Sequence, residues 1–183
     1  MKSISICIGR KGSKGLPGKN KMIIKNNPLC FYPMKAANNS KYITHSFLNT
    51  DDPDLQKIGN KLNHKMLNRP PELASSGALG EDVFANSYQQ ILSSYPDLKD
   101  HFIVLLFCNA PTINSKIIDE AIDLLRQDIN ADSVVSVSRF NMYSPLRARK
   151  LGEGNNYLLP FVPFETFGDP KNLNCDRDSQ GDV

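Results

Sequence analysis

The sequence predicts an α/β fold, in which a mostly parallel sheet is flanked by helices. Strand-like apolar segments alternate along the chain with amphipathic segments of helical period, which is typical of parallel sheets wrapped by helices. The unbroken apolar run in HFIVLLFCNAPT, residues 101–112, is typical of a strand in a sheet covered on both faces. With 183 residues, 40% of them hydrophobic, the chain can bury one core of single-domain size.

The predicted elements follow in order. SISICI, residues 3–8, is a core strand that leads into a glycine-rich segment, and we call residues 9–20 the glycine loop. A helix is expected from Pro28 onward, with Pro33 in its first turn or at a kink. Further strands are expected at 42–50, 101–112 and 132–140, and residues 64–72 are expected to form a short strand that ends in a rigid Pro-Pro loop. Further helices are expected at 53–62, 81–95 and 115–127.

Ligands of parallel α/β sheets bind beyond the carboxyl ends of the strands. Four loops are therefore expected to carry the site, namely 9–20, 49–52, 68–80 and 107–113. After Arg139 the pattern weakens, and the terminal GDV resembles the entry to another strand. We therefore expect part of the domain to be missing from this sequence or supplied elsewhere.

Composition argues against several classes of protein. The four cysteines, Cys7, Cys30, Cys108 and Cys175, are widely separated and form no C-x-x-C pair, so neither a zinc site nor a disulfide framework is expected. No signal-peptide pattern or run of 18 apolar residues is present, which favours a cytoplasmic protein without a membrane partner. The net charge of +3 is too small to indicate nucleic-acid binding by itself.

Positive charge is instead concentrated in and beside the glycine loop. Six cations fall within 16 residues: Arg10, Lys11, Lys14, Lys19, Lys21 and Lys25. Glycines let a backbone approach phosphates closely, while neighbouring cations neutralise them. We therefore predict a loop that holds a triphosphate through Arg10, Lys14 and Lys19. An ordinary flexible surface loop is the alternative.

Other phosphate-loop signatures do not match. The P-loop pattern fails because Asn20 follows Gly18-Lys19 and Ser13 replaces the first glycine. The dinucleotide pattern G-x-G-x-x-G fails at Ser13 as well. The segment GRKG resembles the G-x-x-G loop of an RNA-binding KH module, but a KH loop joins two helices and this segment follows a predicted strand.

The stretch GRKGSKGLPGKN resembles the signature of the sugar-acid cytidylyltransferases, in particular the CMP-N-acylneuraminate (sialic acid) synthetases. PLCFYPMKAA, NTDD, RPPELAS and LLFCNAPT agree with that family in order, so the resemblance runs from about residue 4 to residue 145. It implies a Rossmann-like nucleotidyltransferase domain. We expect a single cytidylyltransferase domain over residues 1–183 that lacks the family's C-terminal elements.

The resemblance also implies an activity, namely transfer of CMP from CTP to an acidic sugar with release of pyrophosphate. Mg²⁺ is the implied cofactor and a homodimer is expected for the full-length form, with no nucleic-acid partner. Arg10 and Lys19 are the implied catalytic residues, since they grip the triphosphate and stabilise charge as pyrophosphate leaves. The further nucleotide-binding residues that it implies are Gly9, Ser13, Lys14, Gly15, Asn20, Arg69, Ala78 and Gly80.

On the sugar side the resemblance points to Phe107, Asn109, Arg177 and Gln180. Here the sequence departs from the family, because FCNAP stands where sialic acid enzymes often have Q-P-T-S-P. Related deoxyoctulosonate enzymes carry a magnesium-binding aspartate at the position of Asn109, so the metal ligands stay unassigned. A different base or sugar, or a nucleotide-binding domain without turnover, are the alternatives.

Few other side chains suggest chemistry. Asp51 either faces the site or caps the helix after it. Cys108 has no evident basic partner, so we expect it to pack in the core rather than act as a nucleophile. The three histidines, His45, His64 and His101, share no metal-ligand spacing.

Overall fold

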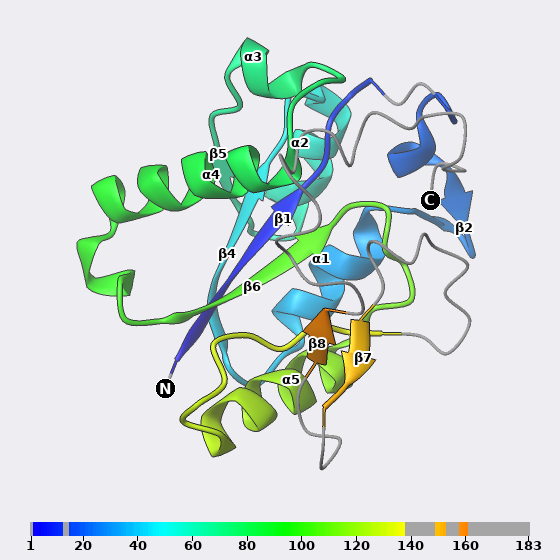
Figure 1. The fold of residues 1–183 in the computed structure, drawn as a ribbon. Coiled ribbons are helices and arrows are strands. Elements are labelled where there is room, and N and C mark those ends of the chain that lie inside the picture. The colour runs from blue at the N-terminus through cyan, green and yellow to red at the C-terminus, as the bar shows by residue number, and fades with distance from the viewer. Residues whose placement is uncertain (1, 13–14, 138–148, 153–157, 161–183) are drawn as a thin grey trace. The chain divides into compact units, whose positions relative to one another are not determined.

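Figure 1 shows the fold in a computed structural model, which describes residues 2–12, 15–137, 149–152 and 158–160. The chain divides into two compact units, residues 1–129 and residues 130–183. The parallel sheet and the loops of interest belong to the first unit. The expectation of a single domain over residues 1–183 stays a prediction.

The described residues form a four-stranded parallel sheet. Its spatial order is β5 (Lys65–Leu67), β4 (Ile43–Asn49), β1 (Ser3–Ile8) and β6 (Phe102–Phe107). Every neighbouring pair runs parallel, with Ser3 opposite both Ile43 and Phe102. The predicted fold class is therefore confirmed.

Strand β1 is central, and all six of its residues are buried. Its side chains alternate between two cores because successive residues of a strand point to opposite faces. Ile4, Ile6 and Ile8 pack with Val83 and Ile91 of helix α4 (Gly80–Ser94). Cys7 packs on the opposite face, in a cluster with one residue from each of three helices: Met34 of α1 (Phe31–Asn38), Leu55 of α2 (Pro53–Lys61) and Ile118 of α5 (Ser115–Gln127). The prediction of a sheet covered on both faces is confirmed.

The helices lie close to their predicted positions. They are α1 (Phe31–Asn38), α2 (Pro53–Lys61), α3 (Pro71–Ala74), α4 (Gly80–Ser94) and α5 (Ser115–Gln127), with short 3-10 turns η1 (Lys19–Lys21) and η2 (Pro96–Leu98). Asn114 caps α5 by accepting the N–H of Ile117 at 3.0 Å. Within the described part of the chain, no helix is long and apolar enough to cross a bilayer.

The start of α1 differs from the prediction. Residues 27–28 do not begin the helix but form β3 (Asn27–Pro28), which pairs antiparallel with β2 (Ile23–Ile24). Lys25 and Asn26 between them have positive φ angles of 46° and 72°, as a tight two-residue hairpin turn requires. Pro33 lies in the first turn of α1, where a helix does not need its missing N–H.

The prediction of a strand over residues 132–140 is wrong for residues 132–137, which are the part that the structure describes. Residues 132–137 adopt no regular structure, and Val135 and Val137 are largely exposed. Without burial or strand pairing, the β propensity of valine does not suffice to form a strand. The second unit contains instead a short antiparallel pair, β7 (Arg149–Leu151) and β8 (Leu158–Pro160).

The strand order positions the candidate site. From β1 the chain runs outward through β4 to β5, and then returns through α4 to β6 on the other side of β1 (Figure 1). The direction of winding thus changes between β1 and β6. In open α/β sheets such a switch point opens a crevice beyond the carboxyl ends of the strands. The glycine loop begins there, directly after β1.

Candidate anion-binding site at the glycine loop

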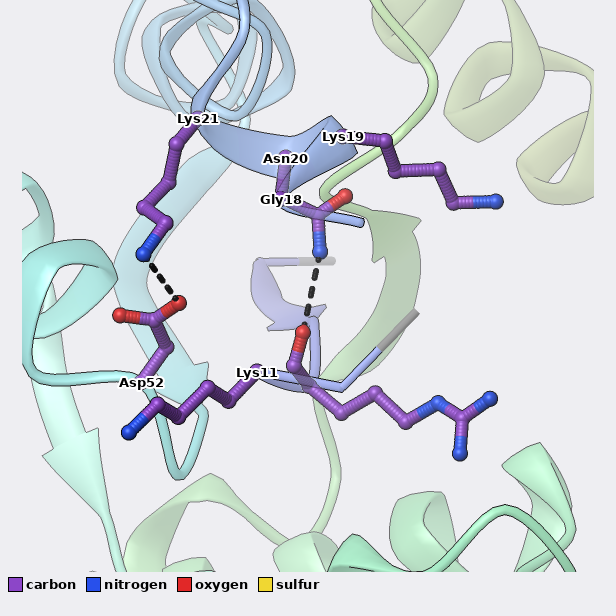
Figure 2. Close-up of a pocket in the computed structure, with 7 residues that line it drawn as sticks. Lys11, Gly18, Lys19, Asn20, Lys21 and Asp52 are labelled. Atoms are coloured by element: carbon purple, nitrogen blue, oxygen red, sulfur yellow. Dashed lines mark hydrogen bonds and ion pairs between the residues drawn. The ribbon is translucent and has the colours of Figure 1, made fainter. Parts of the chain in front are cut away.

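A narrow pocket lies between the two ends of the glycine loop and the start of α2. Figure 2 shows the side chains around it, in which cations predominate. The lining residues are Arg10, Lys11, Gly18, Lys19, Asn20, Lys21 and Asp52. Four cations against one carboxylate give this part of the surface a positive charge, which favours an anion with several negative charges.

The backbone of the loop depends on two glycines. Gly9 leaves β1 in close contact with the strand end of β6: a Cβ atom there would lie 2.5 Å from Sγ of Cys108. Gly18 has φ of +71°, a left-handed conformation that turns the chain into η1. The loop therefore follows a strand and ends in a single 3-10 turn, which is not the helix–loop–helix context of a KH module.

Asn20 connects the two ends of the loop. It is about nine-tenths buried, and its Nδ2 donates to the main-chain oxygen of Arg10 at 3.3 Å. Its own main-chain oxygen accepts the N–H of Cys30 at 3.0 Å, just before α1. Figure 2 shows the side chain of Lys19 extending away from Lys21 and Asp52. The ammonium group of Lys19 therefore takes no part in the ion pair of Lys21 with Asp52.

One arginine connects the 68–80 loop to the glycine loop, and a second holds the 68–80 loop from within. Nη1 of Arg10 donates to the main-chain oxygen of Ser75 at 3.1 Å. Nε and Nη2 of Arg69 both donate to the oxygen of Leu73, at 3.0 Å and 2.8 Å. Burial lowers the pKa of Arg69. The negative charge of Asp51 acts against this shift, and the positive charge of Arg10 adds to it. The guanidinium groups of Arg10 and Arg69 are therefore close enough for the charge of Arg10 to affect Arg69.

The structure resolves the two alternatives for Asp51. Its Oδ1 accepts the main-chain N–H of Lys11 at 2.8 Å, so the side chain faces the glycine loop. The cap of α2 is the next residue, Asp52, whose Oδ1 accepts the N–H of Asp54 at 2.9 Å. Asp52 also lies 3.3 Å from Nζ of Lys21 through its Oδ2.

The predicted triphosphate residues lie partly in the pocket. Arg10, Lys19 and Asn20 line it. Gly9 lies beneath the loop and Gly15 is exposed on it, so neither contributes to the pocket wall. Ser13 and Lys14 lie outside the described residues. The roles assigned to all of them stay predictions.

The remaining predicted residues lie at neighbouring strand ends. Ala78 and Gly80 are half-buried at the end of the 68–80 loop and the start of α4. Phe107 ends β6 and is 47% exposed, while Asn109 follows it and is half-buried. Both positions suit contact with a ligand beyond β6. Arg177 and Gln180 lie outside the described residues.

Sequence reasoning did not assign four pocket residues: Lys11, Gly18, Lys21 and Asp52. Lys11 and Lys21 belong to the cluster of cations noted above, so charge density offered a signal for them. Asp52 offered one too, because NTDD follows a predicted strand at the expected ligand-binding edge. Nothing in the sequence pairs Lys21 with Asp52.

Two buried cysteines, Cys7 and Cys108, and the buried His64 are consistent with packing roles. Sγ of Cys108 lies 3.5 Å from Sγ of Cys7, and both are buried. This hydrogen bond, together with burial, raises the pKa of Cys108 well above that of a free thiol, which keeps it neutral. Nε2 of buried His64 lies 3.2 Å from the main-chain oxygen of Met34. Among the described residues no three His, Cys, Asp or Glu side chains gather to hold a metal ion.

The strand order and the cationic loop at its switch point define an α/β domain of the Rossmann-like type. Solved structures agree: the fold matches a CMP:2-keto-3-deoxy-manno-octonic acid synthetase complexed with CTP at a TM-score of 0.56 and 18% identity, over 71% of this chain and 49% of the other. A cytidylyltransferase from Leptospira borgpetersenii matches at a TM-score of 0.53 and 20% identity, over 71% and 51%. The family model described as Cytidylyltransferase matches residues 4–152. The chain belongs to this cytidylyltransferase family, as its motifs predicted.

Curated relatives carry names from the same family. A Helicobacter pylori protein, named pseudaminic acid cytidylyltransferase and UDP-2,4-diacetamido-2,4,6-trideoxy-beta-L-altropyranose hydrolase, is 29% identical over 84% of this chain and 29% of its own length. An N-acylneuraminate cytidylyltransferase of Streptococcus agalactiae is 31% identical over 88% and 38%. A pseudaminic acid cytidylyltransferase of Campylobacter jejuni is 29% identical over 87% and 67%. The chain thus spans well under half the length of the first two relatives.

Proposed function

We propose that this chain carries the nucleotide-binding part of an enzyme that transfers CMP from CTP to an acidic sugar. In this reaction a hydroxyl oxygen of the sugar forms a bond to the α-phosphorus of CTP. The bond between that phosphorus and the bridging oxygen breaks, pyrophosphate leaves, and the hydroxyl proton is released. The observation that carries the proposal is the pocket lined by Arg10, Lys11 and Lys19 of the glycine loop, which begins directly after β1, and by Asp52, which follows β4.

Electrostatic positioning is what this chemistry mainly demands of a protein. Negative charge develops on the departing pyrophosphate, and cations held in place beforehand stabilise it without reorganising. Arg10 is held by Ser75, and Lys19 is fixed at the backbone by η1. We assign both to the β- and γ-phosphates of CTP, where they lower the barrier to departure.

We assign the base and the sugar to two different sides of the crevice. The 68–80 loop, held by Arg69, would contact cytosine through side-chain and main-chain hydrogen bonds that also involve Ala78 and Gly80. Phe107 and Asn109, beyond β6, would face the sugar. The names of the relatives, which include N-acylneuraminate, pseudaminic acid and 3-deoxy-manno-octulosonate, favour an acidic sugar.

We propose that Mg²⁺ enters as the magnesium salt of CTP. The described residues supply no cluster of carboxylates for the ion, whereas Mg²⁺ is commonly held by substrate phosphates with few protein ligands. The amide oxygen of Asn109 is a neutral donor on the sugar side. When bound, the ion neutralises phosphate charge and orients the reacting groups.

Two further expectations belong to the same proposal. The buried free thiols Cys7, Cys30 and Cys108 suit the reducing cytoplasm, where CTP is also available. We expect the full-length protein to act there as a homodimer, without a nucleic-acid or membrane partner.

Equilibrium binding tests the proposal. The chain is titrated with CTP, UTP, ATP and a short single-stranded RNA, each with and without Mg²⁺. We expect CTP to bind in preference to UTP and ATP, and RNA to bind without comparable affinity. Release of pyrophosphate is then measured with N-acylneuraminate, pseudaminic acid and 3-deoxy-manno-octulosonate as acceptors. RNA binding without any nucleotide preference would overturn the proposal, and CTP binding without turnover would reduce it to nucleotide binding.

A further inference from the structure

The turn between β4 and α2 contacts both ends of the glycine loop. At the beginning of the loop, Oδ1 of Asp51 accepts the main-chain N–H of Lys11 at 2.8 Å. Directly after its end, Nζ of Lys21 lies 3.3 Å from Oδ2 of Asp52 and 3.2 Å from Oδ2 of Asp54. Adjacent aspartates thus hold opposite ends of the loop (Figure 2 shows the second contact).

The aspartate that holds the end of the loop is itself fixed. The side chain of Asp52 is only 3% exposed, and its second oxygen caps α2. A carboxylate in such a position has one orientation that satisfies both partners. The ammonium of Lys21 must come to it, because a buried charge without a partner is strongly destabilising.

A third contact closes the arrangement. Asn20, next to Lys21, donates to the main-chain oxygen of Arg10, next to Lys11. The two ends of the loop are therefore joined to each other as well as to the β4–α2 turn. Arg10 and Lys19, which we assign to the triphosphate, lie inside this closed set of contacts.

Lys21 has a different role from the other cations of the pocket. Hydrogen bonds to Asp54 and Asp52 raise its pKa, so it stays protonated, but its charge is matched by two carboxylates. Arg10, Lys11 and Lys19 form no ion pair with the residues that the structure describes, so they supply most of the positive charge of the pocket wall. Lys21 therefore serves the geometry of the loop more than the charge of the ligand.

We infer that Asp51 and the Lys21–Asp52 pair are positioning residues, which hold the glycine loop in its ligand-binding shape before a triphosphate arrives. A loop that is ordered in advance loses less conformational entropy on binding, and this increases affinity. The identity of the ligand rests on the proposed function, whereas the anchoring of the loop does not.

Matched variants test the inference by binding. Asp51→Ala removes the acceptor for the Lys11 N–H, while Asp51→Asn retains an oxygen that can accept it. Lys21→Met removes the ammonium, while Lys57→Met removes another partner of Asp54, at 3.3 Å, that does not line the pocket. We expect Asp51→Ala and Lys21→Met to raise the Kd of Mg·CTP about tenfold. Asp51→Asn and Lys57→Met should stay within about threefold of the unaltered chain.

Cytidine serves as a second ligand in the same titrations. A variant that merely loosens the fold would weaken cytidine and CTP alike. A loss confined to CTP in Asp51→Ala, which removes no cation from the pocket, shows that the phosphate-binding loop has lost its shape. Unchanged CTP affinity in folded Asp51→Ala and Lys21→Met overturns the inference, and so does an equal loss for cytidine and CTP.

Hydrogen exchange without nucleotide separates this inference from the proposed function. The amide of Lys11 is expected to exchange faster in Asp51→Ala than in Asp51→Asn. If the unaltered chain binds no CTP but the exchange rates differ in this way, the proposed function fails while the anchoring of the loop stands. If the rates are equal, the anchoring fails whatever the ligand.

Discussion

Gly9 and Cys108 lie so close that a methyl group on Gly9 would stand 2.5 Å from Sγ of Cys108 and 2.7 Å from its Cβ. The backbone creates this proximity, because the N–H of Cys108 donates to the oxygen of Ile8 at 3.0 Å. Strands β1 and β6 thus stay paired beyond their last regular residues. The glycine loop starts from a point fixed by two neighbouring strands.

Replacing Gly9 by alanine should destabilise the protein by about 1–3 kcal/mol, since the new methyl must displace packed atoms. Denaturant unfolding followed by circular dichroism measures the loss. Gly12→Ala is the matched control, because a Cβ there meets no described atom within 4 Å outside its chain neighbours. Equal stability of the two variants would contradict the packing role of Gly9.

Replacing Lys19 by alanine should weaken binding of Mg·CTP by about 10- to 100-fold. Hydrogen bonds to charged groups contribute about 1.5–3 kcal/mol, and each 1.4 kcal/mol is about tenfold in Kd. The melting temperature should hardly change, because the side chain extends out of the loop in Figure 2. Lys35→Ala, on the exposed surface of α1, controls for loss of one positive charge. Wild-type affinity in folded Lys19→Ala would remove its phosphate role.

Replacing Arg69 by lysine should reduce the preference for CTP over UTP by about tenfold. Lysine cannot reproduce the two parallel N–H groups that hold the oxygen of Leu73, so the 68–80 loop loses its shape. Competition titrations with the two nucleotides give the ratio. Arg126→Lys on α5 is the control. Retained discrimination in Arg69→Lys would move base recognition to another segment.

Stability should fall as the pH falls below about 6.5, the ordinary histidine value. Burial lowers the pKa of His64, and burial followed by the charge of Lys65 lowers the pKa of His45. In the unfolded chain both take up protons near the ordinary value, while the folded protein keeps them neutral. The stabilisation is therefore complete above that value and is lost as the pH drops toward the folded-state pKa.

Urea unfolding at several pH values measures this dependence. Each histidine contributes at most about 1.4 kcal/mol per pH unit. His64→Gln should give a flatter dependence, since glutamine can still donate to the oxygen of Met34 but does not titrate. An unchanged slope in this variant would show that His64 is not the group responsible.

Local patterns in the sequence were sufficient for most of the fold. The alternation in SISICI predicts a core strand, and β1 is indeed buried on both faces. The helical spacing of residues 115–127 predicts an amphipathic helix, and α5 indeed buries Ile118 and Ile122. The hairpin of β2 and β3 was not predictable in this way. Its strands have two residues each, too few to show a period, and its turn is held from α1 by the hydroxyl of Tyr32 on the oxygen of Ile24.

The same distinction between local and distant sequence signals applies to the candidate site. Arg10, Lys19 and Asn20 are visible in one continuous motif, because a loop that holds phosphates needs glycines and cations close together in sequence. The partners of that loop are not visible in the sequence. Lys11 pairs with Asp51 and Lys21 with Asp52, and α1 and β4 lie between the members of each pair along the chain. Hydrogen bonds between such distant segments leave no periodic trace in a sequence.

The central place of β1 also has a consequence for how the chain folds. Ser3 pairs on one side with Ile43, which follows after about 40 residues, and on the other side with Phe102, which follows after about 100. During synthesis β1 therefore leaves the ribosome long before β6 has been made, and until then its isoleucines lack a complete core. Such distant pairing slows folding. While only the first half of the chain has been made, one edge of β1 is exposed. Aggregation and chaperone binding are most expected at this stage.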